Sequence, residues 1–164
     1  GQNLGAGRPD RARKTVLWAL VYAVALAGTL SLLLIIFAPT VVKAFTRDPD
    51  LIPLAADWLR ILTLSVLCLV VGQVFAQSFN TAGATLAPML VSLVSFWFIE
   101  VPLALMLTGT PIPVGLFGLT VTLPTIAHWG QFGIAWAITI AMAIRMFMFV
   151  PYFMTDHWLK RRVI

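Results

Sequence analysis

The chain has 164 residues, of which 60% are hydrophobic and only 10% are charged, against about 25% charged residues in an ordinary soluble domain. This composition excludes a soluble globular protein and indicates an integral membrane protein. The net charge of +5 does not indicate a nucleic-acid partner, because most of the cations flank apolar segments, where membrane topology already accounts for them.

Four apolar segments have the length of about twenty residues that a helix needs to cross a bilayer. They lie at roughly 16–38, 58–80, 86–107 and 133–154. Lys14 and Pro39 bound the first segment, and a short uncharged turn at 81–85 makes the second and third an antiparallel hairpin. We therefore predict an all-α integral membrane protein with four transmembrane helices, joined on the outer side by connections at 39–57 and 108–132.

The connection at 108–132 contains no lysine, arginine or acidic residue, and it is rich in proline and glycine. Prolines at this density argue against a fifth crossing. Residues 114–123 contain many strand formers, so the sequence leaves open both a short hairpin and a re-entrant segment.

Lysine and arginine predict the orientation. Four cations lie in residues 8–14 and three in residues 160–162, whereas acidic residues offset the cations near 39–57. The positive-inside rule then places both ends in the cytoplasm and the four spans in the inner (plasma) membrane, surrounded by the lipid bilayer. Because no initiator methionine or signal peptide is present, we expect the chain to begin in the middle of a longer protein.

The third segment contains one carboxylate, Glu100, with Pro102 two residues later. An acid in hydrocarbon costs roughly 2.5 kcal/mol or more, so it is a functional candidate by default. Proline has no N–H and crowds the carbonyl four residues earlier, here Phe98. A free carbonyl beside a carboxylate can hold a proton or a small cation, which makes Glu100 the candidate ion-coupling residue.

Arg145, in the fourth segment, is the obvious partner of Glu100. At 1.5 Å per residue the two lie only about 7 Å apart in depth, within reach of two long side chains. The sequence leaves open whether Glu100 carries a coupling ion, forms a structural ion pair with Arg145, or does both during a transport cycle.

Gln73, Gln77 and Asn80 recur at helical spacing and share one face of the second segment. They are either neutral donors and acceptors in a substrate cavity or hydrogen-bonding contacts between helices. Trp97, which a regular helix would place on the face of Glu100, completes the substrate-cavity candidates. No metal-ligand cluster, nucleophile–base pair or phosphate loop is present, and Cys68 is the only cysteine. We therefore predict a protein that is not an enzyme and has no cofactor.

Four motifs resemble, in order, the multidrug and toxic compound extrusion (MATE) family. They are the opening segment 1–12 (GQNLGAGRPDRA), the outer loop 45–49 (FTRDP), the inner loop 80–85 (NTAGAT) with its following 88–89 (PM), and the helix 100–104 (EVPLA).

The resemblance implies that these are the last four of twelve helices in a transporter with two lobes. The first lobe of the same polypeptide would then be missing, with part of the second. It also implies an antiporter that exports small organic compounds, many of them cationic, with H⁺ or Na⁺ as the coupling ion.

Two other functions are compatible with the residues. A related flippase would move a lipid-linked saccharide, although such a cavity needs many cations and Arg145 is alone in mid-membrane. A small four-helix scaffold would be complete in itself.

Overall fold

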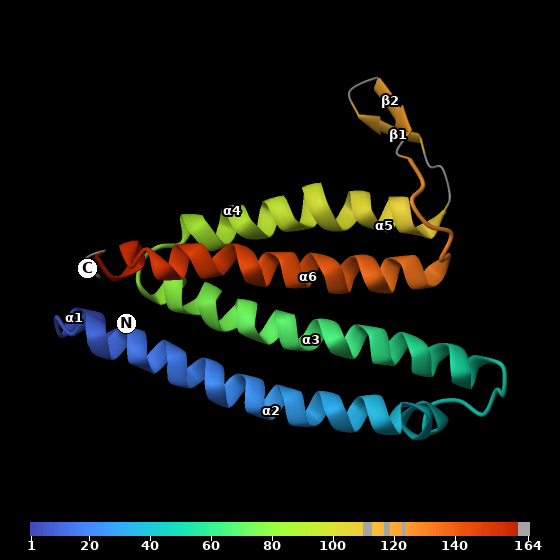
Figure 1. Ribbon diagram of the computed structural model, residues 1–164, viewed down its shortest axis with the longest axis horizontal. Helices are drawn as coiled ribbons and strands as arrows, with labels where there is room; N and C mark the ends of the chain where they lie inside the picture. Colours follow the sequence, from blue (N-terminus) through green and yellow to red (C-terminus); the bar gives the residue numbers. More distant parts are fainter. Residues whose placement is uncertain (110–112, 117–118, 123, 161–164) are drawn as a thin grey trace.

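The computed structural model describes residues 1–109, 113–116, 119–122 and 124–160. Four apolar helices dominate it, each long enough to cross a membrane (Figure 1). They are α2 (Pro9–Lys43), α3 (Leu51–Thr81), the continuous helix formed by α4 (Leu86–Val94), η1 (Ser95–Glu100) and α5 (Val101–Thr108), and α6 (Gln131–Met154). Two short pieces, α1 (Gln2–Gly5) and η2 (His157–Lys160), flank them. The predicted all-α membrane architecture is confirmed, since each predicted segment lies within one of these helices.

The four helices lie side by side in an open row, in the order α2, α3, α6 and then α4–η1–α5 (Figure 1). The last long helix of the chain is thus inserted between the second and the third. The beginning of α2 and the end of α6 lie at the same end of the long axis along which the helices run, which we call the basic end of the row. This agrees with an even number of crossings, although Arg161 and Arg162 of the predicted basic tail lie outside the described residues.

The first helix passes through Pro39 and ends only at Lys43, so the predicted end at Pro39 is wrong. Proline leaves the carbonyl of the fourth residue before it, Ile35, without its helical N–H partner. The Nε of Arg60, on α3, donates to that Ile35 carbonyl at 3.3 Å. Arg60 also forms an ion pair with Asp57 at 2.9 Å. Because the neighbouring helix satisfies the carbonyl, α2 continues without a break.

The connection between α2 and α3 is therefore 44–50 rather than the predicted 39–57. The carboxylate of Asp48 accepts hydrogen bonds from the N–H groups of Asp50 at 2.9 Å and Leu51 at 3.4 Å. A side chain that satisfies the first N–H groups of a helix favours its beginning at that point. As a result α3 begins at Leu51, well before the predicted apolar segment.

In the 108–132 connection the described residues form a hairpin, one of the two alternatives left open. The strands β1 (Pro113–Leu116) and β2 (Leu119–Thr122) pair in antiparallel fashion, with Leu116 opposite Leu119. The hairpin stands away from the row of helices, beyond the end of α5 (Figure 1). The chain then returns to the row, where the N–H of Trp129 donates to the carbonyl of Leu107 at 3.1 Å.

Small residues set the distance between α6 and its neighbours. A Cβ atom at Gly133 would lie only 2.5 Å from the Leu107 carbonyl oxygen of α5. On the same side of α6, the hydroxyl of Ser95 donates to the carbonyl of Ala141 at 3.3 Å. Glycine and alanine allow this close approach, and a serine hydroxyl can then bond across two membrane helices.

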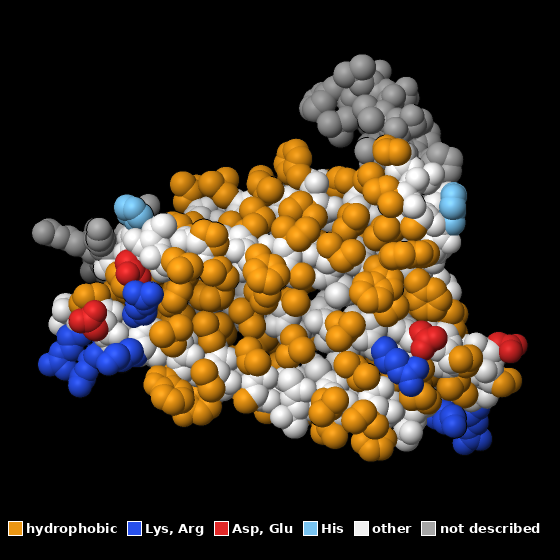
Figure 2. Space-filling model, in the orientation of Figure 1, with side chains coloured by type: hydrophobic (Ala, Val, Ile, Leu, Met, Phe, Trp, Pro, Cys, Tyr) orange, Lys and Arg blue, Asp and Glu red, His pale blue; other side chains and the backbone are white. Residues whose placement is uncertain are grey.

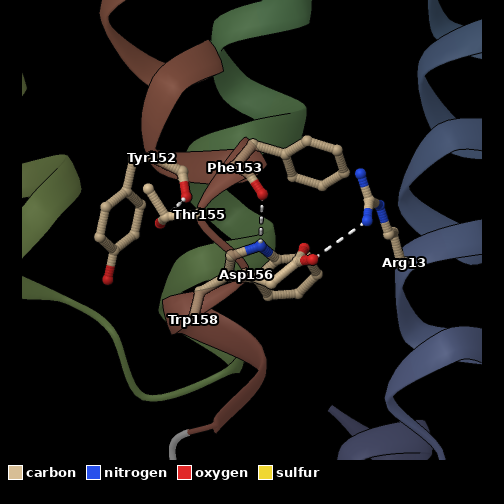
Figure 3. Close-up of polar contacts among 6 residues, drawn as sticks. All are labelled: Arg13, Tyr152, Phe153, Thr155, Asp156 and Trp158. Carbon is tan, nitrogen blue, oxygen red and sulfur yellow. Dashed lines mark hydrogen bonds and ion pairs between the residues drawn. The ribbon is translucent and has the colours of Figure 1, made fainter.

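At the basic end, an aromatic cluster and an ion pair hold α2, α3 and α6 together. The ring of Phe153 lies 5.5 Å from that of Trp158, whose Nε1 donates to the Phe153 carbonyl at 3.3 Å. Arg13, from α2, pairs with Asp156 at 3.0 Å, and its guanidinium lies 5.7 Å from the centre of the Phe153 ring (Figure 3). The cluster also contains the buried residues Phe75, Phe79 and Phe149, with Tyr152 packed against them. The start of the first long helix is thereby attached to the end of the last.

The row leaves most of its apolar surface uncovered. In the most apolar 18-residue stretch of each helix, only 11% to 33% of the residues are buried. In Figure 2, hydrophobic side chains cover the central part of one broad face, and charged ones gather toward the two ends. A surface of this kind requires lipid or further helices around it.

Candidate functional site

Glu100 lies at the end of a π-helical turn in the middle of the third membrane helix. In this turn, Ser95–Glu100, the N–H of Val101 bonds to the carbonyl of Phe96, five residues earlier. The next residue, Pro102, has no N–H to continue an α-helical pattern. Turns of this type are rare and are frequently found at functional sites. The free carbonyl of Phe98 stays a prediction.

The π turn also changes which residues share a face with Glu100. A regular helix would place Trp97 beside it, but Trp97 lies inside the π turn and is 59% exposed. One extra residue in a turn rotates everything after it by about 100° relative to what precedes it. Helical spacing therefore does not place Trp97 beside Glu100, and its role in a substrate cavity stays a prediction.

The carboxylate of Glu100 is half-buried and has no hydrogen-bond donor or ion-pair partner among the described residues.

Arg145, on the neighbouring helix α6, bonds to a residue other than Glu100. Its Nη2 donates to the hydroxyl of Ser92 at 2.8 Å, which links α6 to α4. Among the described residues, Arg145 forms no direct ion pair with Glu100. The ion pair, one of the alternatives that the sequence left open, is therefore absent from the described contacts.

Ser92 was missed as a member of this site. It lies about two helical turns before Glu100 in a segment with few polar residues, and a hydroxyl in such a segment is a candidate for bonding between helices. Thus Ser92, Glu100 and Arg145 form one polar group on two adjacent helices.

Gln73 and Gln77 lie elsewhere in the row. Both are exposed on α3, on one stripe with Leu69 and Asn80, and neither side chain makes a hydrogen bond with the described residues. They therefore do not connect α3 to α2 or α6. Helix α6 lies between them and Glu100, so the structure does not bring all the predicted site residues into one cluster.

Comparison with known proteins identifies the family. The sequence profile of the MatE family matches residues 1–106, well over half of the chain. The chain belongs to the MatE family. The MATE resemblance of the four loop and helix motifs is thereby confirmed.

Several curated relatives are similar to this MatE chain. It is 22% identical to the probable multidrug resistance protein NorM of Thermotoga maritima, over 100% of this chain and 32% of that protein. It is 21% identical to the probable multidrug resistance protein YoeA of Bacillus subtilis, over 99% of the chain and 31% of the relative. A protein named FAD transporter, from Shewanella oneidensis, is 29% identical over 75% of the chain and 26% of its own length.

The chain thus spans about a third or less of the length of these relatives. No solved structure matches it.

Proposed function

We propose that this chain forms the last four of twelve membrane helices in a secondary active antiporter. The transporter would export small organic compounds, many of them cationic, in exchange for H⁺ or Na⁺ entering the cell. MatE membership and the multidrug resistance names of two relatives support the transport class. The open row of helices supports the need for further helices of the same polypeptide, including the amino-terminal lobe.

The observation that carries the coupling role is the state of Glu100. A carboxylate in the middle of an apolar helix, without a donor or a direct counter-ion, is costly unless something neutralises it. A proton or a sodium ion would neutralise it, and a site whose exposure alternates between the two sides can take up the ion outside and release it inside. Arg145, held by Ser92, adds a positive charge that favours release.

We further propose that both ends of the chain face the cytoplasm of a cell bounded by an inner (plasma) membrane. The Arg13–Asp156 pair holds the beginning of α2 and the end of α6 together at the basic end. The cations of residues 8–14 lie at this end, and the positive-inside rule assigns such a cluster to the cytoplasm.

The coupling role is tested by Glu100→Gln in the complete transporter, reconstituted into vesicles with an imposed proton or sodium gradient. Glutamine keeps the shape and hydrogen bonding of the side chain but does not titrate. We expect gradient-driven uptake of a fluorescent organic cation to fall to the level of protein-free vesicles, while binding of that cation persists. Asp10→Asn, the same chemical change outside the apolar part of α2, should transport normally. Wild-type uptake by Glu100→Gln would exclude the coupling role.

A second candidate substrate class is organic anions. The guanidinium of Arg145 lies in mid-membrane and has no direct acidic partner among the described residues, so it could bind an anionic group. The similarity to a protein named FAD transporter favours the same class. In the vesicles described above, FAD and the organic cation should be compared. Uptake of FAD that is lost in Arg145→Gln would favour the anion.

A further inference from the structure

A groove of about 520 Å³ runs along the first turns of α2 at the basic end of the row. Arg11 and Lys14 line its upper part, which is nearer the beginning of α2. Trp18 and Tyr22 line its lower part, which is farther along the helix, and Asn3 of α1 also lines the groove. Figure 2 shows basic side chains at the beginning of α2 beside a group of hydrophobic side chains on the surface.

The upper part of the groove presents two cations that form no ion pair with the described residues. Arg11 and Lys14 are exposed, and neither forms an ion pair with the described residues. Arg13, between them in sequence, is instead paired with Asp156. Asp10 is the only acid in the first turn of α2. Two adjacent free cations at a membrane surface attract an anion.

The lower part of the groove is aromatic. The rings of Trp18 and Tyr22 are stacked with centroids 5.9 Å apart, and the two residues are 60% and 69% exposed. At 1.5 Å per residue they lie about 6 Å and 12 Å deeper along the helix than Lys14. Tryptophan and tyrosine at this depth are typical of the boundary between lipid headgroups and acyl chains.

A polar contact fixes the edge of the groove. The Nδ2 of Asn3 donates to the hydroxyl of Thr15 at 3.2 Å, and that hydroxyl donates to the Arg11 carbonyl at 2.8 Å. Helix α1 is thereby held over the beginning of α2, next to the two free cations. The groove therefore has a definite upper boundary.

We infer that this groove binds an anionic phospholipid of the cytoplasmic leaflet. The phosphate lies between Arg11 and Lys14, and the glycerol and first acyl carbons lie against Trp18 and Tyr22. Free phosphate would use the cations alone, whereas the aromatic wall directly below them suits a molecule with an apolar part. Charge complementarity selects anionic over zwitterionic headgroups. The inference does not depend on the transported substrate or on the coupling ion.

The test is native mass spectrometry of the complete protein, delipidated in detergent and titrated with phosphatidylglycerol or with phosphatidylcholine of the same acyl chains. The wild type should prefer phosphatidylglycerol. The double variant Arg11→Gln/Lys14→Gln should bind it about twenty-fivefold more weakly, at about fivefold for each cation, and lose the preference. The control Lys43→Gln/Arg47→Gln removes two cations from the opposite end of the helices. It should keep both the affinity for phosphatidylglycerol and the preference for it over phosphatidylcholine.

Two further arms distinguish the possible ligands. Trp18→Leu/Tyr22→Leu should weaken binding of both lipids, and excess inorganic phosphate should not displace phosphatidylglycerol. Undiminished preference in Arg11→Gln/Lys14→Gln would overturn the inference. So would displacement by phosphate together with no effect of the aromatic substitutions, which would indicate a phosphate site. If the double variant does not fold, Arg11→Gln and Lys14→Gln singly should each weaken binding about fivefold.

Discussion

The close approach of α5 and α6 makes Gly133 the most sensitive glycine of the row. A Cβ atom there would lie 2.5 Å from the oxygen and 2.6 Å from the carbon of the Leu107 carbonyl, and 2.8 Å from the nitrogen of Thr108. Ordinary contacts require about 3.5 Å, so Gly133→Ala must push the two helices apart by about 1 Å. Because the obstacles are backbone atoms, a change of side-chain rotamer cannot relieve them.

Overpacking of this kind costs about 1–3 kcal/mol, and the better helix propensity of alanine offsets up to about 1 kcal/mol of it. With a backbone clash we expect the upper part of the range, a net loss of about 2 kcal/mol in the free energy of unfolding. Gly72→Ala is the matched control. Its Cβ would lie 3.9 Å from the nearest atom of Phe149, an ordinary contact, so this variant should be as stable as the wild type or slightly more stable.

The assay is unfolding of the complete protein in mixed micelles that contain an increasing fraction of a denaturing detergent. Tryptophan fluorescence follows the unfolding. Gly133→Ala should unfold at a lower denaturant fraction than the wild type, and Gly72→Ala should not. Equal stability of the two variants would show that α5 and α6 are not packed as closely as the structure has them.

Three other predictions test the row and its polar residues. Arg60→Gln should destabilise the protein by about 1–3 kcal/mol in the same unfolding assay, because the carbonyl of Ile35 loses its donor; an unchanged midpoint would mean that another group satisfies it. Gln77→Ala, on an exposed stripe, should change the relative export of different compounds more than the amount of folded protein, measured by export assays and quantitative blotting; a uniform loss in proportion to protein would indicate a packing role. The double variant Glu100→Gln/Arg145→Gln should fold, by size-exclusion chromatography, and remain inactive in gradient-driven uptake, whereas near wild-type uptake would show that Glu100 is not the coupling residue.

The candidate site was predictable only in part. A lone acid and a lone arginine in apolar segments stand out in any sequence, and antiparallel helices at similar depth predict that they lie close together. Helical spacing is no guide to the face of Trp97, because it assumes one period along the whole helix and the π turn shifts that period. Arg145 bonds to Ser92 rather than to Glu100. This choice depends on the exact position of the side-chain atoms, which the spacing of residues in the sequence does not give.

Composition and hydrophobic length alone determined that this protein has four membrane helices, since apolar segments of about twenty residues have few alternatives to crossing a bilayer. The motifs in their order were also sufficient to indicate the family. The order of the helices in the row was decided only by tertiary structure, because packing of small residues such as Gly133 inserts α6 between α3 and α5. Tertiary structure likewise decided that α2 passes through Pro39. A proline ends a helix in isolation, but Arg60 of the neighbouring helix donates to the carbonyl that the proline leaves unpaired.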